Sequence, residues 1–221
     1  WFQSSHSSVR GGVCVSDIVL VHGLWNRGWM MARMAKRLRT RGHQVRVFSY
    51  PTRSDTLDGH ADQLRRFIRE GDAGECHLAG HSMGGLVILN MLSRYHDLPP
   101  GRVVLMGTPV KGSNVVRRLE RLPGHGFIFG KSRENLLKGF QHSPGGRESG
   151  MIRGTREFGF GQIAGKQQEP NDGSVCVSET ELDGLKDTVD LEVSHSEMLI
   201  SSEVVDQLEH FVLSGKFKKV T

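Results

Sequence analysis

Short apolar runs alternate with amphipathic stretches through the first half of this chain. Asp17–Val21 and Arg102–Met106 are rich in consecutive apolar residues, as buried strands are, and Gln44–Phe48 alternates apolar with polar side chains. Trp29–Arg41 and Leu57–Glu70 instead repeat apolar residues every three or four positions, which is the spacing of an amphipathic helix. Strands that alternate with helices predict an α/β fold, with a parallel sheet covered by helices.

The pattern breaks in the middle of the chain. Val110–Phe158 contains nine glycines and two prolines, and an irregular segment of this length inside a compact domain is usually functional or disordered. We therefore expect a cap insertion at about residues 110–158. Phe160–Ala164 and Thr188–Val193 then resume the strands, and Ser196–Leu213 is predicted to close the fold as a helix.

Together these elements predict a single domain over residues 9–221. Its centre is expected to be a mostly parallel sheet of about six strands, flanked by helices, and residues 1–8 are expected to lie outside it. A chain of 221 residues is long enough to bury a substantial core. No apolar run approaches the ~20 residues that a membrane-spanning helix needs.

The motif Gly80-His81-Ser82-Met83-Gly84 carries the first chemical prediction. It follows Glu75–Ala79, predicted as a strand, and precedes Gly85–Leu92, predicted as a buried helix. A serine at such a strand–turn–helix junction is typical of a nucleophile elbow. The chain has 28 glycines, so the motif alone is weak evidence, and the flanks carry the prediction that Ser82 is a nucleophile. His81 is expected to pack rather than to react.

A serine hydroxyl needs a base to take its proton and an acid to orient that base. In folds of this kind they follow in the order serine, acid, histidine, at the carboxyl edge of the sheet. Asp172, in a turn, is the favoured acid, and His195, directly after the last predicted strand, is the favoured base. Asp183, Asp187 and Asp190 are the alternative acids, although the last two lie toward the opposite edge.

The oxyanion of an acyl-transfer intermediate needs preplaced donors. We expect these to be the backbone N–H groups of Met83, directly after the serine, and Leu24, in the loop after the first core strand. His22 is expected to hydrogen-bond that loop, and Trp29 to pack in the core. The candidate substrate contacts are His22, Trp25, Val110, Phe127 and Phe129.

The net charge of +5 is concentrated in the predicted cap. Between Lys111 and Glu157 there are ten Lys or Arg and four Asp or Glu. This excess could steer an anionic substrate or a membrane surface, and the cap is either a mobile lid or a subdomain that packs on itself. Nothing predicts nucleic-acid binding. Three cysteines without metal-type spacing predict no metal site and favour a reducing compartment such as the cytoplasm.

These residues together resemble the α/β-hydrolase superfamily, and within it the small bacterial lipases and esterases. The resemblance is carried by Val19–Trp25, Gly80–Gly85, Gly107-Thr108-Pro109, Asp172 and His195. It implies the triad and the oxyanion donors named above. It also implies hydrolysis of small-molecule or lipid acyl esters through an acyl-enzyme, without a cofactor.

Two features depart from that family pattern. Its smallest lipases have little cap, whereas this chain inserts residues 110–158, and Val110 stands where many relatives carry histidine. Both leave the substrate open, as the sequence leaves the oligomeric state open. An acyl thioesterase or an acyltransferase would use the same residues, and the non-enzymatic alternative is a binding protein that kept the fold.

Overall fold

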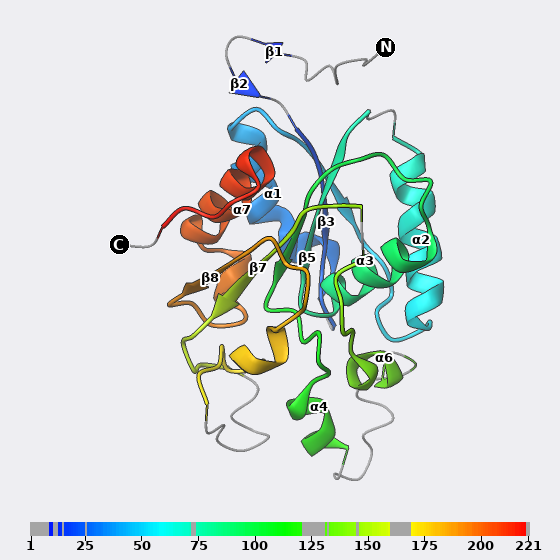
Figure 1. The fold of residues 1–221 in the computed structure, drawn as a ribbon, viewed down its shortest axis with the longest axis vertical. Coiled ribbons are helices and arrows are strands. Elements are labelled where there is room, and N and C mark those ends of the chain that lie inside the picture. The colour runs from blue at the N-terminus through cyan, green and yellow to red at the C-terminus, as the bar shows by residue number, and fades with distance from the viewer. Residues whose placement is uncertain are drawn as a thin grey trace.

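The computed structural model of this chain describes residues 9–10, 13–14, 16–24, 26–71, 74–120, 131, 133–144, 146–159 and 169–219. At the centre of this described part is a six-stranded sheet of order β4-β3-β5-β6-β7-β8, in which every neighbouring pair is parallel (Figure 1). The strands are β3 (Asp17–Val21), β4 (Gln44–Phe48), β5 (Cys76–His81), β6 (Val103–Met106), β7 (Ser149–Gly154) and β8 (Asp187–Leu191). A short antiparallel ribbon, β1 (Val9–Arg10) and β2 (Val13–Cys14), precedes them. The predicted α/β class is confirmed.

Helices cover both faces of the sheet. They are α1 (Ala32–Thr40), α2 (Leu57–Arg69), α3 (Met83–Arg94), α4 (Asn114–Leu119), α6 (Arg133–Lys138) and α7 (Ser202–Ser214). Single 3-10 turns are η1 (Gly28–Met31), η4 (Val177–Thr180) and η5 (Glu197–Leu199). Helices α1 and α7 lie on one face, and α2 and α3 on the other (Figure 1). None of the helices in the described part is long and apolar enough to cross a bilayer.

Alternation along β3 divides the core into two layers. Ile18 and Leu20 are fully buried with the apolar side chains of α1 and α7, whereas Val19 and Val21 are fully buried with those of α2 and α3. Successive side chains of a strand point to opposite faces, so a strand covered by helices on both sides is apolar throughout. This is why the apolar run at Asp17–Val21 predicts the central strand correctly.

One strand lies inside the segment predicted as a cap, so the predicted boundary at 158 is wrong. Strand β7 pairs with both β6 and β8, in the place given to Phe160–Ala164, which lies outside the described residues. Its glycines explain the error. A Cβ at Gly150 would lie 2.5 Å from the ring of Phe211 in α7. A strand that needs glycine for close helix packing has little apolar pattern to recognise.

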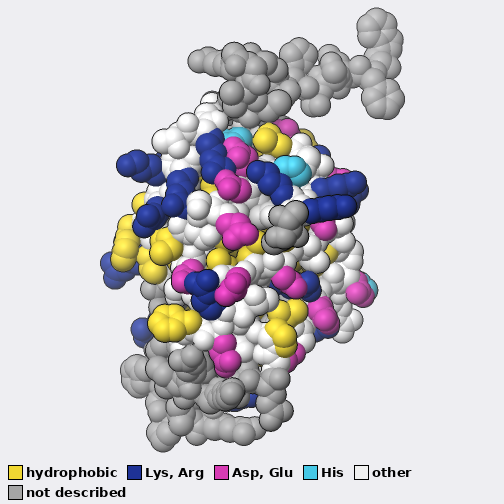
Figure 2. Space-filling view, turned by 90° about the vertical axis from the view of Figure 1, so that its left-hand side faces the viewer, with side chains coloured by type: hydrophobic (Ala, Val, Ile, Leu, Met, Phe, Trp, Pro, Cys, Tyr) yellow, Lys and Arg dark blue, Asp and Glu magenta, His cyan; other side chains and the backbone are white. Residues whose placement is uncertain are grey.

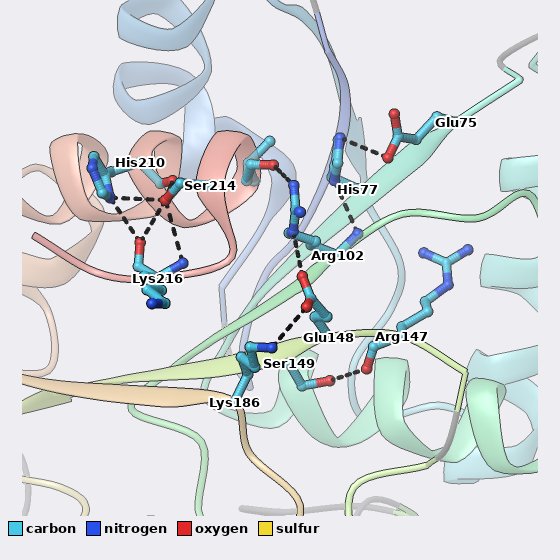
Figure 3. A network of polar contacts seen from close by, with 11 residues as sticks. Glu75, His77, Arg102, Arg147, Glu148, Ser149, Lys186, His210, Ser214 and Lys216 are labelled. Carbon is cyan, nitrogen blue, oxygen red and sulfur yellow. Dashed lines mark hydrogen bonds and ion pairs between the residues drawn. The ribbon is translucent and has the colours of Figure 1, made fainter. Parts of the chain in front are cut away.

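A polar network joins the amino ends of the strands (Figure 3). Arg102 donates to the Glu148 carboxylate over 2.8 Å and to the backbone oxygen of Val212 over 2.7 Å. Its own backbone N–H donates to His77 Nδ1 over 2.9 Å, and Lys186 Nζ lies 3.1 Å from Glu148 Oε1. Hydrogen bonds from Arg102 and then Lys186 lower the pKa of Glu148. The network links the starts of β5 to β8 with α7.

Candidate active site

Ser82 lies between β5 and α3, at the carboxyl edge of the sheet. Its backbone has φ 55° and ψ −127°, and it is the one non-glycine residue with positive φ in the described part of the chain. A non-glycine residue held in such a region costs about 1–3 kcal/mol. The backbone is therefore that of the strained turn predicted from the motif. Strand β3 is flanked by β4 and β5, and in open α/β sheets ligands bind where the strand order reverses in this way.

The loop after β3 lies directly against the serine. A Cβ at Gly23 would be 2.8 Å from the Cβ of Ser82, and a Cβ at Gly84 would be 2.3 Å from the backbone oxygen of Val21. The first turn of α3 and the end of β3 therefore touch through backbone alone. This contact brings the loop that carries Leu24 beside the residue that follows the serine, Met83.

Asp172 and His195 are joined across the same edge of the sheet. His195 Nδ1 lies 2.7 Å from Asp172 Oδ2, and the backbone N–H of His195 donates to the Asp172 carbonyl over 2.8 Å. Asp172 is buried, and its Oδ1 accepts the backbone N–H groups of Ser174 and Val175. With Nδ1 protonated toward the carboxylate, His195 Nε2 is left as the basic nitrogen.

The alternative acids lie elsewhere. Asp190 on the edge strand β8 pairs with Arg153 on the neighbouring strand β7, and Asp187 Oδ2 accepts the backbone N–H of Phe217 over 2.8 Å. Asp183 is exposed and lies 3.6 Å from His142. None of these carboxylates is hydrogen-bonded to the histidine that Asp172 contacts.

A capping motif fixes the loop that carries His195. The backbone N–H of Ser194 donates to Glu197 Oε2 over 2.8 Å, and the backbone N–H of Glu197 lies 3.4 Å from Ser194 Oγ. Hydrogen bonds from Ser194 lower the pKa of Glu197, and Arg156 pairs with its other oxygen. Glu197 was not predicted from the sequence, although Ser-x-x-Glu is a recognisable capping-box signature.

Gly107 is a second residue that the sequence analysis did not assign a role. Its φ is +52°, and a Cβ there would lie 2.9 Å from Asp172 Oδ2 and 3.1 Å from His195 Nδ1. Any larger residue would press on both partners of the 2.7 Å hydrogen bond. The motif Gly107-Thr108-Pro109 was the only available signal, because the contact depends on residues distant in sequence.

His81 lies beneath His195. The two rings have centroids 4.5 Å apart, and His81 Nε2 lies 2.9 Å from the backbone oxygen of His195. Since a carbonyl oxygen only accepts, this nitrogen carries the proton. Complete burial lowers the pKa of His81 well below its ordinary value, so the ring is neutral and holds the loop of His195 by a hydrogen bond.

Ser82 and His195 both line a cavity of about 200 Å³. Its apolar walls come from the loops that follow β3 and β6, from η1 and η5, from the loop that carries Asp172 and from the predicted cap. These apolar residues are Leu24, Met30, Pro109, Val115, Val116, Leu136, Val175 and Leu199. The cavity therefore combines a hydroxyl, an imidazole and an apolar lining at the carboxyl edge of the sheet.

A buried carboxylate connects the cap to the loop that carries Asp172. Glu179 accepts the backbone N–H of Asn114, the first residue of α4, and that of Cys176 over 2.7 Å. The backbone N–H of Lys111 also donates to the Glu179 carbonyl over 3.0 Å. Burial raises the pKa of Glu179. Sequence reasoning missed this residue, because Cys176 is an unusual partner in a capping box.

Two other predicted residues are buried away from the cavity. His22 stacks on Tyr50 with ring centroids 4.6 Å apart, and its Nδ1 lies 3.0 Å from the Gly23 carbonyl. Burial lowers the pKa of His22. It supports the loop as expected, but it does not line the cavity. Val110 is fully buried in the core beside α3 and does not line the cavity either.

The tryptophan prediction needs one correction. Trp29 was expected in the core but is 72% exposed. Trp29 belongs to the 3-10 turn η1, which has three residues per turn where an α-helix has 3.6. The side chains that face the core therefore differ from those expected for an α-helix. Met31 is the buried residue of that turn. Trp25, Phe127 and Phe129 lie outside the described residues.

Comparison with known proteins identifies the family. Residues 18–168 match the model of the alpha/beta hydrolase family, and this stretch is more than half of the chain. The chain therefore belongs to the α/β hydrolase family. Within the described residues, no three His, Cys, Asp or Glu side chains are grouped to hold a metal ion.

Several esterases and lipases are similar to this chain. The carbendazim hydrolyzing esterase of Nocardioides sp. (strain SG-4G) is 32% identical over 92 residues, which is 36% of this chain and 37% of that protein. The mature lipase BlEst2 of Bacillus licheniformis superposes with a TM-score of 0.67 at 19% identity, over 89% of this chain and 90% of its own. A metagenomic carboxyl esterase gives 0.67 at 15% identity, over 81% and 64%. At these identities the two solved structures establish a shared fold.

Proposed function

We propose that this chain is a serine hydrolase that cleaves carboxylic esters of small-molecule or lipid substrates. The observation that carries the proposal is the 2.7 Å hydrogen bond between His195 and buried Asp172, at a cavity that His195 shares with Ser82. The strained backbone of Ser82 supports it, since such strain clusters at reactive groups. The esterases and lipases with the same fold agree with this assignment.

The proposed reaction has two halves. Ser82 Oγ attacks the ester carbonyl while His195 Nε2 takes the hydroxyl proton, and Asp172 holds the imidazole and stabilises its charge. The backbone N–H groups of Leu24 and Met83 receive the oxyanion. The bond to the alcohol oxygen then breaks, the proton passes to the alcohol, and the acyl group remains on Ser82. Water, deprotonated by His195, releases the acid and restores the serine.

The cavity suggests a short acyl group. Its volume of about 200 Å³ is below the range of about 300–1,000 Å³ that holds a drug-sized ligand. Val115, Val116 and Leu136 close it from the cap side. We expect acetyl and butyryl esters to react faster than long-chain esters, unless the cap opens on contact with a long substrate.

A fluorophosphonate probe tests the nucleophile. Wild-type protein should be labelled, whereas Ser82→Ala should not, and Ser93→Ala on the exposed end of α3 is the matched control. Folded wild-type protein that resists the probe would contradict the proposal and favour a binding role. p-Nitrophenyl esters of two to twelve carbons, compared with acyl thioesters of equal length, then measure the chain length and separate an esterase from a thioesterase.

A further inference from the structure

A second cavity adjoins the first. It is an open groove of about 760 Å³ at the carboxyl edge of β3 and β4, formed by the loops that follow these strands. The groove walls include Arg27 from the first loop and Ser49, Thr52 and Arg53 from the second. Asn26 lines both the groove and the cavity of Ser82. One ligand could therefore occupy both.

The groove is basic, and its described lining residues include no acidic side chain. From residue 18 to residue 54 the sequence contains eight Lys or Arg and no Asp or Glu. The next carboxylate along the chain, Asp55, is turned to the start of α2, where Oδ1 accepts the N–H of Thr56 and Oδ2 accepts from Gln63. Among the described residues, the guanidinium groups of Arg27 and Arg53 have no hydrogen-bond or ion-pair partner.

Basic residues elsewhere are more often matched. On the side of α1, α7 and β8, positive and negative side chains are intermingled (Figure 2), and Arg41 lies 2.7 Å from Glu209 there. In the predicted cap, Lys111 pairs with Glu181, Arg133 with Glu120 and Arg156 with Glu197. Side chains that are already paired attract an anion weakly. The groove is therefore a better candidate for an anion site than the predicted cap.

The polar groups of the groove suit an anion. A guanidinium binds a carboxylate or a phosphate through charge-assisted hydrogen bonds. Ser49 Oγ accepts the backbone N–H of Gly28 over 3.2 Å, which leaves its hydroxyl proton able to donate. Tyr50 also lines the groove, but its hydroxyl donates to the His22 carbonyl over 2.9 Å and does not compete for the ligand.

We propose that the groove is an anion subsite, in which Arg27 and Arg53 bind a carboxylate or phosphate on the alcohol part of the substrate. The inference rests on the proposed ester hydrolysis and names its substrate class: short-chain acyl esters of an anionic alcohol or phenol. The acyl group occupies the 200 Å³ cavity at Ser82. The leaving group extends past Asn26 into the groove.

The test compares 4-acetoxybenzoate with 4-acetoxybenzamide, which have the same acyl group and differ in leaving-group charge. In wild type, kcat/KM should be higher for 4-acetoxybenzoate than for 4-acetoxybenzamide. The ratio of the two values should fall about 10-fold in the double variant Arg27→Gln/Arg53→Gln, because charged hydrogen bonds are lost. Added salt should lower the wild-type ratio. Lys36→Gln, an exposed charge on α1, is the matched control and should keep that ratio.

Two further arms complete the design. Calorimetric titration of 4-acetoxybenzoate into Ser82→Ala protein measures binding without hydrolysis, and the two arginine substitutions should weaken it about 10-fold. The kcat/KM for a short-chain phosphatidic acid, compared with that for the matching diacylglycerol, shows whether the groove also favours a substrate with a lipid phosphate. Hydrolysis of both acetates at a ratio that the arginines do not change would overturn this inference alone. Failure of wild type on every ester would overturn the proposed function, while the calorimetric arm still decides the subsite.

Discussion

The two edges of the parallel sheet use polar groups in opposite ways. At the amino edge, Arg102, Glu148 and Lys186 satisfy one another near solvent, and the pKa of Glu148 is lowered (Figure 3). At the carboxyl edge, Ser82 has a strained backbone, and burial raises the pKa of Glu179. The first arrangement stabilises the fold. The second costs stability and positions groups for chemistry, so substitutions at the two edges should have different consequences.

The largest effect is expected from Ser82→Gly. Loss of the nucleophile should lower kcat by a factor of about 10⁴–10⁶, while relief of the positive φ should raise the free energy of unfolding by about 1 kcal/mol. Ester hydrolysis and urea unfolding measure the two changes. Ser93→Gly, at the exposed end of α3, is the control and should change the free energy of unfolding by less than about 0.5 kcal/mol without loss of activity. A destabilised Ser82→Gly would contradict the argument from strain.

Asp172→Asn should lower kcat about 10⁴-fold, because an amide in this place favours the wrong tautomer of His195. The matched control is Asp190→Asn, at an exposed carboxylate of β8 that pairs with Arg153. Steady-state kinetics should show a change of less than about 3-fold for this control, since surface pairs contribute little. Equal losses in both variants would remove Asp172 from its proposed role.

His81→Leu should lower kcat about 10-fold to 10²-fold with little change in KM, because the loop of His195 loses its hydrogen bond and small misplacements are costly. His81→Gln, which can donate to the same carbonyl, should recover part of the rate. A change confined to KM, or a glutamine variant no better than leucine, would show that His81 only fills space.

The smallest effect is expected at the amino edge. Glu148→Gln should lower the free energy of unfolding by about 0.2–1 kcal/mol at pH 7, as for other surface pairs, and leave kcat/KM unchanged. The lowered pKa of Glu148 means that its contribution is present above the usual glutamate pKa and disappears as pH falls through the folded value. Urea unfolding between pH 3 and 7 should therefore show less acid destabilisation in the variant than in wild type.

Glu179 should change stability with pH in the opposite direction to Glu148. Its raised pKa means that the folded state binds a proton more readily than the unfolded state, so its contribution to stability increases as pH falls through the folded value. Glu179→Gln should remove this increase in the same titration. Parallel pH profiles for the Glu148 and Glu179 variants would contradict the contrast between the two edges.

Local pattern was sufficient to predict most of the fold. The apolar run of β3, the helical spacing of α2 and the flanks of Ser82 each encode their element within a few residues. Strand β7 was not predicted, because glycine at position 150 is required by contact with Phe211, more than sixty positions further along the sequence. A contact of this kind leaves no periodic signal at either position.

The candidate site divides in the same way. The order of residues along the chain predicted Ser82, Asp172 and His195 as site residues. The structure places Asp172 and His195 in contact, beside the cavity that Ser82 lines. Their catalytic roles stay a prediction until the probe is applied. Arg27 and Arg53 were not singled out, because an anion subsite depends on two separate loops meeting and on a described lining that contains no Asp or Glu.

Gly107 has a practical consequence for anyone who evolves this protein. Its missing side chain leaves only enough room for the contact between Asp172 and His195. A saturation library at this codon should return glycine alone among active clones, even though the residue performs no chemistry. Diversity for new substrates is better placed in the loops around Arg27 and Arg53, where exposed side chains can be exchanged without disturbing that contact.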